Sequence, residues 1–325
     1  MFREVCLLLL LVVGLGCTEN GRVADRAATS EPITGRSSEE KSSEFPPATL
    51  LEARRGYQTQ LQRQEREQEP LDVPPEDVFA LVTFPAAPGP LAAYVSQPPQ
   101  PNQRYPAMIW LTGGFPVGGI GASAWEPADP ANDQSAKVYR ERGMIMMYPT
   151  LRGTYGNPGV QEGFYGEVDD VIAAAEYLAK QPFVDPERIY LGGHSTGGTL
   201  ALLVAEATDL FRGVVSFGPV EDPFFYGEDT LLHKRGIVRE RLLRAPINFV
   251  GFVQSPTVVV EGTQGNVGSL AQLQAAAIDN EHMSFVMVPS MDHFSVLSPV
   301  NAILADRILN SPDERLKLST ADLVR

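Results

Sequence analysis

Hydrophobic and polar positions alternate along the chain in two kinds of segment, short apolar runs and longer amphipathic stretches. Residues 107–111 form a continuous apolar run, as expected for a strand buried on both faces of a parallel sheet, whereas residues 163–180 have the spacing of an amphipathic helix. Two strands at 78–84 and 91–96 precede them, joined by a proline-flanked turn. Further strands are predicted at 144–148, 188–191, 213–217, 257–261 and 284–288, and further helices at 198–207, 269–278 and 300–309. This alternation predicts an α/β fold: a mostly parallel sheet with helices on both faces, entered through an antiparallel hairpin.

The first 17 residues have the layout of a secretory signal peptide. A positively charged start is followed by an apolar run over 5–15, which is too short to span a bilayer comfortably, and then by Gly16 and Cys17. Leu15-Gly16-Cys17 also resembles a bacterial lipobox, in which the cysteine is acylated, although Gly14 stands where a leucine is usual. We therefore expect an exported protein. It is either a cell-envelope lipoprotein tethered to the membrane through Cys17 or a freely periplasmic or secreted protein.

A polar segment separates this signal from the main apolar pattern. Residues 18–43 consist mostly of Ser, Thr, Glu, Arg and Gly, the composition of a disordered tether. Residues 50–69 are predicted to form an exposed helix that Pro70 ends. The predicted division is a signal at 1–17, a tether at 18–76, a main domain at 77–312 and a tail at 313–325.

Charge and cysteine content exclude several classes of function. The chain of 325 residues has a net charge of −14, so no nucleic-acid partner is expected. Both cysteines, Cys6 and Cys17, lie in the first 20 residues, which leaves the body of the protein without a disulfide or a thiolate metal site. We expect neither a metal nor a cofactor.

The sequence Gly193-His194-Ser195-Thr196-Gly197 is a G-x-S-x-G motif between a predicted strand and a helix of small residues. This is the nucleophile elbow of the α/β-hydrolase fold, a tight turn that lifts a serine hydroxyl above the edge of the sheet. The turn forces the nucleophile into a strained backbone conformation, so a side chain at Gly193 or Gly197 would collide with the neighbouring strand or helix. Ser195 is therefore the predicted nucleophile.

Serine needs an adjacent base, and the chain has four histidines. His194 lies inside the elbow, where the turn should direct it away from Ser195. His233 and His282 are predicted to lie at the surface. His293 follows the last predicted strand, where the chain order serine, acid, histidine of this fold places the base. We predict His293.

The third member of such a triad is harder to assign. It is normally a carboxylate in the loop after the strand that ends at Glu261, where it would hold the tautomer of His293, but that loop has no aspartate. Glu261 is the nearest carboxylate and has the longer side chain, and Asp222, after the preceding strand, is the second candidate. Otherwise the third member is an Asn266-type residue or is absent. Asp292 is expected to point elsewhere, because it is adjacent to the histidine in sequence.

Backbone N–H groups are needed to stabilise the oxyanion that forms during acyl transfer. One is expected from Thr196, directly after the nucleophile. The other is expected from Gly114 or Phe115, in the glycine-containing turn that follows the predicted strand at 107–111. This turn lacks the G-K-[ST] ending of a phosphate loop, so nucleotide binding is not predicted.

Motifs spread along residues 78–310 resemble, in order, the catalytic domain of the prolyl oligopeptidase family. They are Leu151-Arg152-Gly153-Thr154-Tyr155-Gly156, Glu167-Val168-Asp169-Asp170, Val184-Asp185-Pro186-Glu187-Arg188-Ile189, Gly193-His194-Ser195-Thr196-Gly197-Gly198, Arg244-Ala245-Pro246-Ile247-Asn248-Phe249, Pro256-Thr257-Val258-Val259-Val260-Glu261-Gly262 and Asp292-His293-Phe294. The resemblance implies the α/β-hydrolase fold, with Ser195 and His293 as nucleophile and base. The family's aspartate, three positions after Gly262, is replaced here by Gly265.

Further family features are only partly matched. The resemblance implies that Arg152 pairs with Asp169 or Asp170 as part of the scaffold. The β-propeller that gates the family's oligopeptidases has no counterpart in this chain, and residues 221–253 are long enough only for a short helical lid. Phe224-Phe225-Tyr226 in that segment is a candidate wall of an acyl or aromatic pocket.

The sequence thus predicts an exported serine hydrolase that cleaves a small ester, an amide or a short peptide through an acyl-enzyme on Ser195. Two further functions stay open. The missing aspartate favours a binding protein of the same fold that has lost efficient catalysis. An acyltransferase is the second, because only the exclusion of water distinguishes it from a hydrolase.

Overall fold

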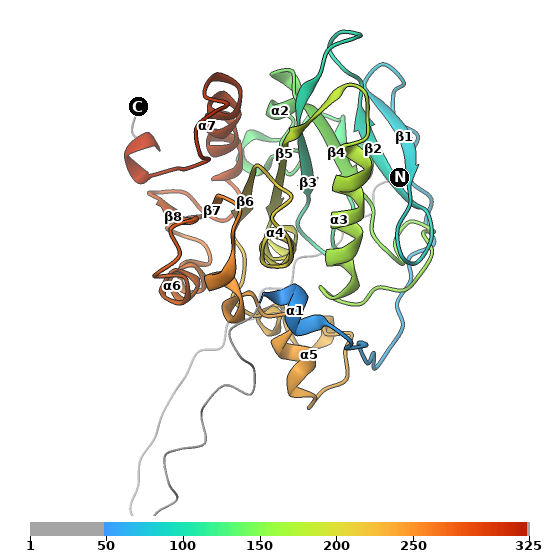
Figure 1. The fold of residues 1–325 in the computed structure, drawn as a ribbon, viewed down its shortest axis with the longest axis vertical. Helices are drawn as coiled ribbons and strands as arrows, with labels where there is room; N and C mark the ends of the chain where they lie inside the picture. The colour runs from blue at the N-terminus through green and yellow to red at the C-terminus, as the bar shows by residue number, and fades with distance from the viewer. Residues whose placement is uncertain (1–48, 324–325) are drawn as a thin grey trace, which may run out of the picture. The chain divides into compact units, whose positions relative to one another are not determined.

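An eight-stranded sheet runs through the part of the chain that the computed structural model describes, residues 49–323 (Figure 1). Its strands are β1 (Phe79–Phe84), β2 (Leu91–Ser96), β3 (Tyr105–Leu111), β4 (Ile145–Pro149), β5 (Val184–His194), β6 (Gly213–Phe217), β7 (Thr257–Gly262) and β8 (Met283–Val288). They lie in the order β1-β2-β4-β3-β5-β6-β7-β8. β1 and β2 form an antiparallel hairpin, and β2 pairs antiparallel with β4. The other five pairings are parallel, as the alternating pattern predicts.

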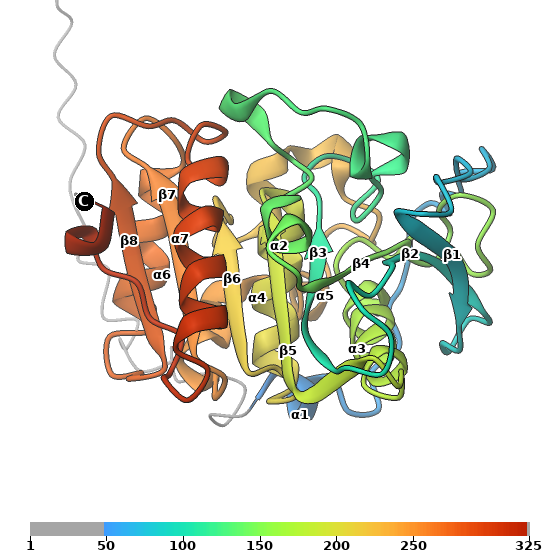
Figure 2. The same ribbon diagram turned by 90° about the horizontal axis from the view of Figure 1, so that it is seen from above.

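Helices cover both faces of this sheet (Figures 1 and 2). They are α1 (Leu50–Arg54), α2 (Val138–Glu141), α3 (Gly166–Leu178), α4 (Thr196–Ala207), α5 (Val238–Leu242), α6 (Val267–Ala276) and α7 (Leu297–Asn310). Short 3-10 turns are η1 (Gly121–Ala124), η2 (Pro130–Asn132), η3 (Pro223–Tyr226), η4 (Glu228–Thr230), η5 (Pro246–Asn248), η6 (Val250–Phe252) and η7 (Thr320–Leu323). The helices α1, α3, α4 and α6 cover one face, and α2 and α7 cover the other.

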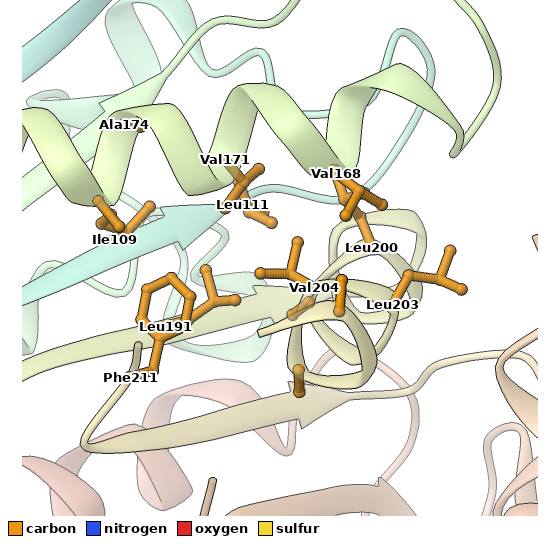
Figure 3. Close-up of a cluster of buried hydrophobic side chains, with 14 of the residues drawn as sticks. Ile109, Leu111, Val168, Val171, Ala174, Leu191, Leu200, Leu203, Val204 and Phe211 are labelled. Atoms are coloured by element: carbon orange, nitrogen blue, oxygen red, sulfur yellow. The ribbon is translucent and has the colours of Figure 1, made fainter. Parts of the chain in front are cut away.

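Strand β3 explains why both faces need a cover. Successive side chains of a strand point to opposite faces, so Ile109 and Leu111 pack towards α3 and α4, while Met108 and Trp110 pack towards α2 and α7. All four are buried. Figure 3 shows the first of these cores, in which Leu111 lies among apolar side chains of α3 and α4. A continuous apolar run is therefore the pattern of a strand with no solvent-facing side.

The parallel strands place the predicted site residues at one edge of the sheet. Ser195 directly follows β5, Glu261 is the penultimate residue of β7, and His293 lies in the loop between β8 and α7. These are the carboxyl ends of parallel strands, where open α/β sheets bind their ligands.

The predicted helix over 50–69 is wrong beyond its first turn and a half. Helix α1 begins after the capping residue Thr49, and its C-cap, Arg55, directly precedes Gly56 (φ +70°). Beyond it, the N–H groups of Gln62 and Glu67 donate to the carbonyl oxygens of Leu232 and Gly153 at 2.8 Å each. The backbone of this segment is therefore paired with loops of the domain and not with itself. We call residues 57–67 the strap.

The predicted domain boundaries also change. The strap makes the domain begin well before residue 77, and the described residues 49–323 all belong to one compact unit. Downstream of residue 312, Leu316 and Leu318 are buried against the α7 face, and Arg307 of α7 forms an ion pair with Asp322. The predicted tail is thus part of the domain as far as residue 323.

The predicted signal peptide, Cys17 and the tether up to residue 48 lie outside the described residues. Among residues 49–323, no helix has the length and apolar content needed to cross a membrane.

Candidate active site

Ser195 occupies a sharp turn between β5 and α4. Its backbone has φ 55° and ψ −115°, a conformation that non-glycine residues rarely adopt. Its N–H donates to the carbonyl of Phe217 in β6 at 2.8 Å, and its own carbonyl accepts the N–H of Thr199 at 2.9 Å. The predicted elbow is therefore present, held by the adjacent strand and by the first turn of the helix.

The glycines of the motif are required by close backbone approaches. A Cβ at Gly193 would meet the carbonyl of Gly197, and a Cβ at Gly197 would meet the carbonyl of Leu111 in β3. Both obstacles are backbone atoms, which cannot move aside as a flexible side chain could. The predicted collisions are confirmed, and they explain why the turn excludes larger residues at these positions.

His293 and Glu261 form a pair beside this elbow. The Nδ1 atom of His293 lies 3.0 Å from Oε2 of Glu261, whose carboxylate is buried. The N–H groups of Gly262 and Asn266 also donate to that carboxylate, at 2.7 and 2.9 Å. Glu261 is thus held in place by three donors, and with Nδ1 occupied by the carboxylate, Nε2 is the nitrogen left for the nucleophile.

Two glycines make room for this pair. Gly218 follows Phe217, whose carbonyl accepts the N–H of Ser195. It has φ +56°, and a Cβ at this position would overlap the His293 ring. A Cβ at Gly265 would overlap the carboxylate of Glu261. Glu261 therefore fills the space next to the position where the family pattern has its aspartate. The sequence could not predict the contact between Glu261 and His293, and it therefore did not decide between Glu261 and Asp222 as the acid.

The other two carboxylates have structural partners instead. Asp222 caps the turn η3 by accepting the N–H of Phe224 at 3.0 Å, and it forms an ion pair with Arg241 at 2.5 Å. The Asp292 side chain accepts the N–H groups of Phe294 and Ser295 at 2.9 and 2.8 Å, which shapes the loop that carries the histidine. Its pKa is lowered mainly by these hydrogen bonds. Neither carboxylate bonds to His293, so the assignment of the acid to Asp222 is not supported by the geometry.

His194 points away from the nucleophile, as predicted, and supports the loop of His293. Its Nε2 lies 2.9 Å from the carbonyl oxygen of His293, and its Nδ1 lies 2.9 Å from the side-chain amide of Gln134. Burial, with a smaller contribution from the His293 charge, lowers the pKa of His194 to about 4. The ring is therefore neutral at pH 7 and carries a single N–H.

The prediction that His233 lies at the surface is wrong. His233 pairs with Leu61 of the strap in an isolated antiparallel bridge and is buried. Burial lowers its pKa. The sequence could not reveal this, because the covering segment lies some 170 residues earlier and has no strand pattern. His282 is half-buried and lies next to Arg315.

The predicted oxyanion loop lies against the start of α4. The hydroxyl of Thr196 donates to the carbonyl of Gly114 at 2.7 Å, and a Cβ built on Gly113 would lie 3.1 Å from Cβ of Ser195. As the first residue of the helix, Thr196 has an N–H without an intrahelical acceptor, at the end where the helix dipole favours negative charge. The N–H groups of Gly114 and Phe115 form no hydrogen bond within the described part of the chain. Their role in an oxyanion hole stays a prediction.

Tyr226 is a site residue whose role sequence reasoning missed. Its hydroxyl lies 2.7 Å from Oγ1 of Thr199 and near the Ser195 side chain. Burial raises the pKa of this phenol above its usual range, which keeps its proton in place. Its ring packs against Phe164 and Phe115, with centroids 5.9 and 5.6 Å apart. The aromatic run at 224–226 was the only sequence signal, and of its members Phe225 is exposed.

Arg152 has the scaffold role that the family resemblance implies. Its Nε and Nη2 donate to the two carboxylate oxygens of the buried Asp170 at 2.9 and 2.8 Å, and its Nη1 donates to Glu162 at 2.8 Å. Asp169, the other predicted partner, pairs with Arg54 of α1. Among residues 49–323, no group of three His, Cys, Asp or Glu side chains is arranged to hold a metal ion.

The family model described as "Prolyl oligopeptidase family" matches residues 130–238 of the chain. The matched segment includes the elbow with Ser195 and ends before Glu261 and His293. The assignment of those two residues therefore depends on their geometry in the structure.

Curated relatives are similar over about half of the chain. The Probable dipeptidyl-aminopeptidase B of Talaromyces marneffei is 30% identical over an alignment of 196 residues, which covers 56% of this chain and 20% of that protein. The Uncharacterized peptidase YtmA of Bacillus subtilis is 26% identical over 181 residues, 52% of this chain and 66% of that protein. The chain thus spans a fifth of the length of the fungal relative and about two thirds of the bacterial one.

A solved structure with the same fold is the acylaminoacyl peptidase of Pyrococcus horikoshii. It aligns with a TM-score of 0.59 at 14% identity, over 76% of this chain and 44% of that one. At this identity the likeness concerns the fold alone, and the predicted α/β-hydrolase fold is confirmed.

Proposed function

We propose that this chain, a relative of the prolyl oligopeptidase family by its match over residues 130–238, is a serine hydrolase that works through an acyl-enzyme on Ser195. The observation that carries the proposal is a serine in a strained elbow together with a histidine that packs on the preceding residue, His194, and whose Nδ1 lies 3.0 Å from the buried carboxylate of Glu261. That arrangement supplies a nucleophile, a base and the group that orients the base.

The reaction follows from these positions. Oγ of Ser195 attacks the carbonyl carbon of an ester or amide while its proton passes to Nε2 of His293. The developing oxyanion is stabilised by N–H groups at the start of α4 and in the turn at 114–115. His293 then gives the proton to the leaving alcohol or amine as the bond to it breaks. Water then attacks the acyl-enzyme in the same way, with His293 again taking the proton. This step releases the acid and restores the serine.

Peptide or aminoacyl bonds are the proposed substrates in the first place. The fungal and bacterial relatives carry peptidase names, and the family match includes the nucleophile. Small esters are proposed as additional substrates, because an ester needs less help with its leaving group than an amide. Comparing kcat/KM for aminoacyl amides with kcat/KM for small esters distinguishes a peptidase from an esterase.

The hypothesis of a catalytically impaired binding protein depended on the missing aspartate at position 265. Glu261 supplies a carboxylate to His293 from another position, which removes the main argument for that hypothesis. No observation on the described residues favours an acyltransferase over a hydrolase.

The test is the intact mass of the protein after incubation with a fluorophosphonate. We expect a single adduct on the wild-type chain and none on Ser195→Ala, with an unchanged adduct on Ser319→Ala as the control for an exposed serine elsewhere. Ser195→Ala should also abolish turnover of short esters and of aminoacyl anilides while its melting temperature stays nearly unchanged. Equal turnover by Ser195→Ala would contradict the proposal.

Export is proposed from the sequence of residues 1–17 alone, as either a lipoprotein acylated at Cys17 or a freely secreted protein. Metabolic labelling with a radioactive fatty acid in a bacterial host tests the first form. Label that is present on the wild type and absent from Cys17→Ala supports the lipoprotein, and an unlabelled protein that has lost its first residues supports simple secretion. A full-length cytosolic protein would contradict both.

A further inference from the structure

A cavity of about 300 Å³ lies beside the aromatic residues that flank the nucleophile. Phe115 and Leu151 line it from the loops after β3 and β4, and Leu232 lines it from the loop after β6. Phe115 packs edge-to-face on Tyr226, whose hydroxyl bonds to Thr199 in the first turn of α4 and lies near the Ser195 side chain. One layer of aromatic side chains therefore connects this cavity to the nucleophile.

The strap closes the cavity on the side away from these loops. Arg63 and Glu65 line it and form an ion pair of 2.6 Å, and Arg63 also donates to the carbonyl of Asp229. Each side chain of this pair is somewhat less than half exposed. The strap thus presents a charged, hydrogen-bonding surface, and the other walls combine apolar side chains with the buried, charged Arg152 and Glu167.

The strap is fixed at both ends, so this wall has a defined position. At its start, Tyr57 donates to the carboxylate of Glu240 at 2.6 Å, and Glu240 is buried in an ion pair with Arg244 at 2.5 Å. At its other end, the N–H of Glu67 donates to the carbonyl of Gly153 at 2.8 Å, and the N–H of Gly156 donates to the carbonyl of Glu67 at 2.9 Å.

The cavity lies on the side of Ser195 where the acyl half of a substrate would bind. His293, which gives its proton to the leaving group, follows β8, on one side of β5 in the sheet. The cavity is lined mainly from the loops after β3 and β4, on the other side of β5, with a contribution from the loop after β6, and Phe115 of the predicted oxyanion turn is part of its wall. A carbonyl bound at Ser195 with its leaving group near His293 has its acyl portion directed towards the cavity.

We propose that this cavity is the acyl-binding site and that the strap sets the length of the acyl group it accepts. The proposal rests on the proposed hydrolase function. The volume is at the lower end of the range of about 300–1,000 Å³ for small-molecule sites, so the acyl group is short, on the order of one to two amino-acid residues. Phe115, Leu151 and Leu232 offer this group apolar contacts, and Arg152 and Glu167 add two buried charged side chains to the lining. The outer end of the acyl group is polar and contacts Arg63 and Glu65.

The experiment uses the full chain and a series of substrates with one leaving group, p-nitroaniline, and acyl portions of one to five amino-acid residues. For the wild type we expect kcat/KM to be highest at one or two residues and at least tenfold lower at four or five. Arg63→Ala removes the ion pair and the bond to the Asp229 carbonyl, and should raise kcat/KM for the long substrates, relative to the short ones, by about tenfold. The change should appear in KM, because Arg63 does not touch the reacting atoms.

Arg66→Ala is the matched control, since Arg66 lies on the same strap, is exposed and does not line the cavity. It should leave the length profile unchanged. Glu65→Gln is a second test that keeps the shape of the side chain, and it should shift the profile in the same direction as Arg63→Ala. A wild-type profile without length dependence, or equal profiles for Arg63→Ala and Arg66→Ala, would overturn the proposal.

The two proposals fail in different ways. If Ser195 takes up no fluorophosphonate and nothing is turned over, the hydrolase function itself is wrong. If Ser195 reacts and substrates are cleaved, but the length profile does not depend on Arg63 or Glu65, only the role of the strap is wrong.

Discussion

Glu261 reaches His293 from within strand β7, with its Oε2 atom 3.0 Å from Nδ1 of the imidazole. A carboxylate in a strand is held by the sheet, and this one also accepts the N–H groups of Gly262 and Asn266. The acid of the candidate triad is therefore fixed before any substrate binds. This arrangement needs no reorganisation during the reaction, as electrostatic catalysis requires.

The first prediction concerns this acid. Glu261→Gln should lower kcat by roughly 10²–10⁴-fold, because an amide neither stabilises the imidazolium nor enforces the correct tautomer. Asp222→Asn should change kcat far less, since Asp222 pairs with Arg241 and does not touch His293. Steady-state kinetics on a short anilide measures both. A larger loss in Asp222→Asn would transfer the role to that residue.

A second prediction exchanges the position of the carboxylate. Gly265→Asp alone should impair activity and folding, because its side chain would overlap the carboxylate of Glu261. In Glu261→Ala the obstructing atoms are gone, so the double variant Glu261→Ala/Gly265→Asp should recover at least tenfold in kcat over Glu261→Ala.

The control for this exchange is Glu261→Ala/Gly265→Asn, which has the same shape without the charge. It should stay as slow as the single variant Glu261→Ala. Equal recovery in the Asn and Asp variants would mean that the gain comes from filling space and not from a carboxylate next to His293.

Tyr226 gives the third prediction. Its hydroxyl bonds to Thr199 in the first turn of α4 and lies near the Ser195 side chain, so Tyr226→Phe should lower kcat by about tenfold or more while the aromatic packing is kept. A change confined to KM would indicate that the phenol only binds substrate. Phe225→Leu is the control, because Phe225 is exposed and should tolerate the change without effect on kcat.

The fourth prediction follows from the pKa of His194, which is about 4 in the folded protein and 6.5 in the unfolded chain. Between these values the unfolded chain binds more protons, so the free energy of unfolding falls as the pH drops through this window. The contribution of the neutral His194 to the free energy of unfolding is complete above pH 6.5, and about 2 kcal/mol of this contribution is lost by pH 5.

Urea unfolding at pH 7.5 and pH 5 measures this difference. His194→Asn, which does not titrate in this range, should lose correspondingly less stability between the two pH values than the wild type. An equal loss in both proteins would show that other groups cause the acid sensitivity. The Asn variant should also lower kcat, since it weakens the contact that holds the His293 carbonyl.

Several parts of this protein could be predicted from local patterns. The apolar run over 107–111 predicts a doubly buried strand without reference to the rest of the chain, because a strand without polar positions must be covered on both faces. The elbow around Ser195 could also be predicted locally, because its glycines are required by steric clashes that a side chain would cause in this turn. His293 followed from chain order once the strands were counted.

Other parts depended on contacts between segments far apart in sequence. Glu261 was one of several carboxylates until the sheet brought it to His293, 32 residues later. Tyr226 reached Ser195 only because the loop after β6 folds back over α4. The strap has no apolar periodicity and pairs with loops near residues 153 and 232, so its polar sequence favoured an exposed helix. Local sequence determined the strands of the sheet, the helices that cover it and the elbow of the predicted nucleophile, because steric and burial demands act within a few residues. The acid, the cavity and its wall were decided by the tertiary structure, because their partners are chosen by the packing of the whole domain.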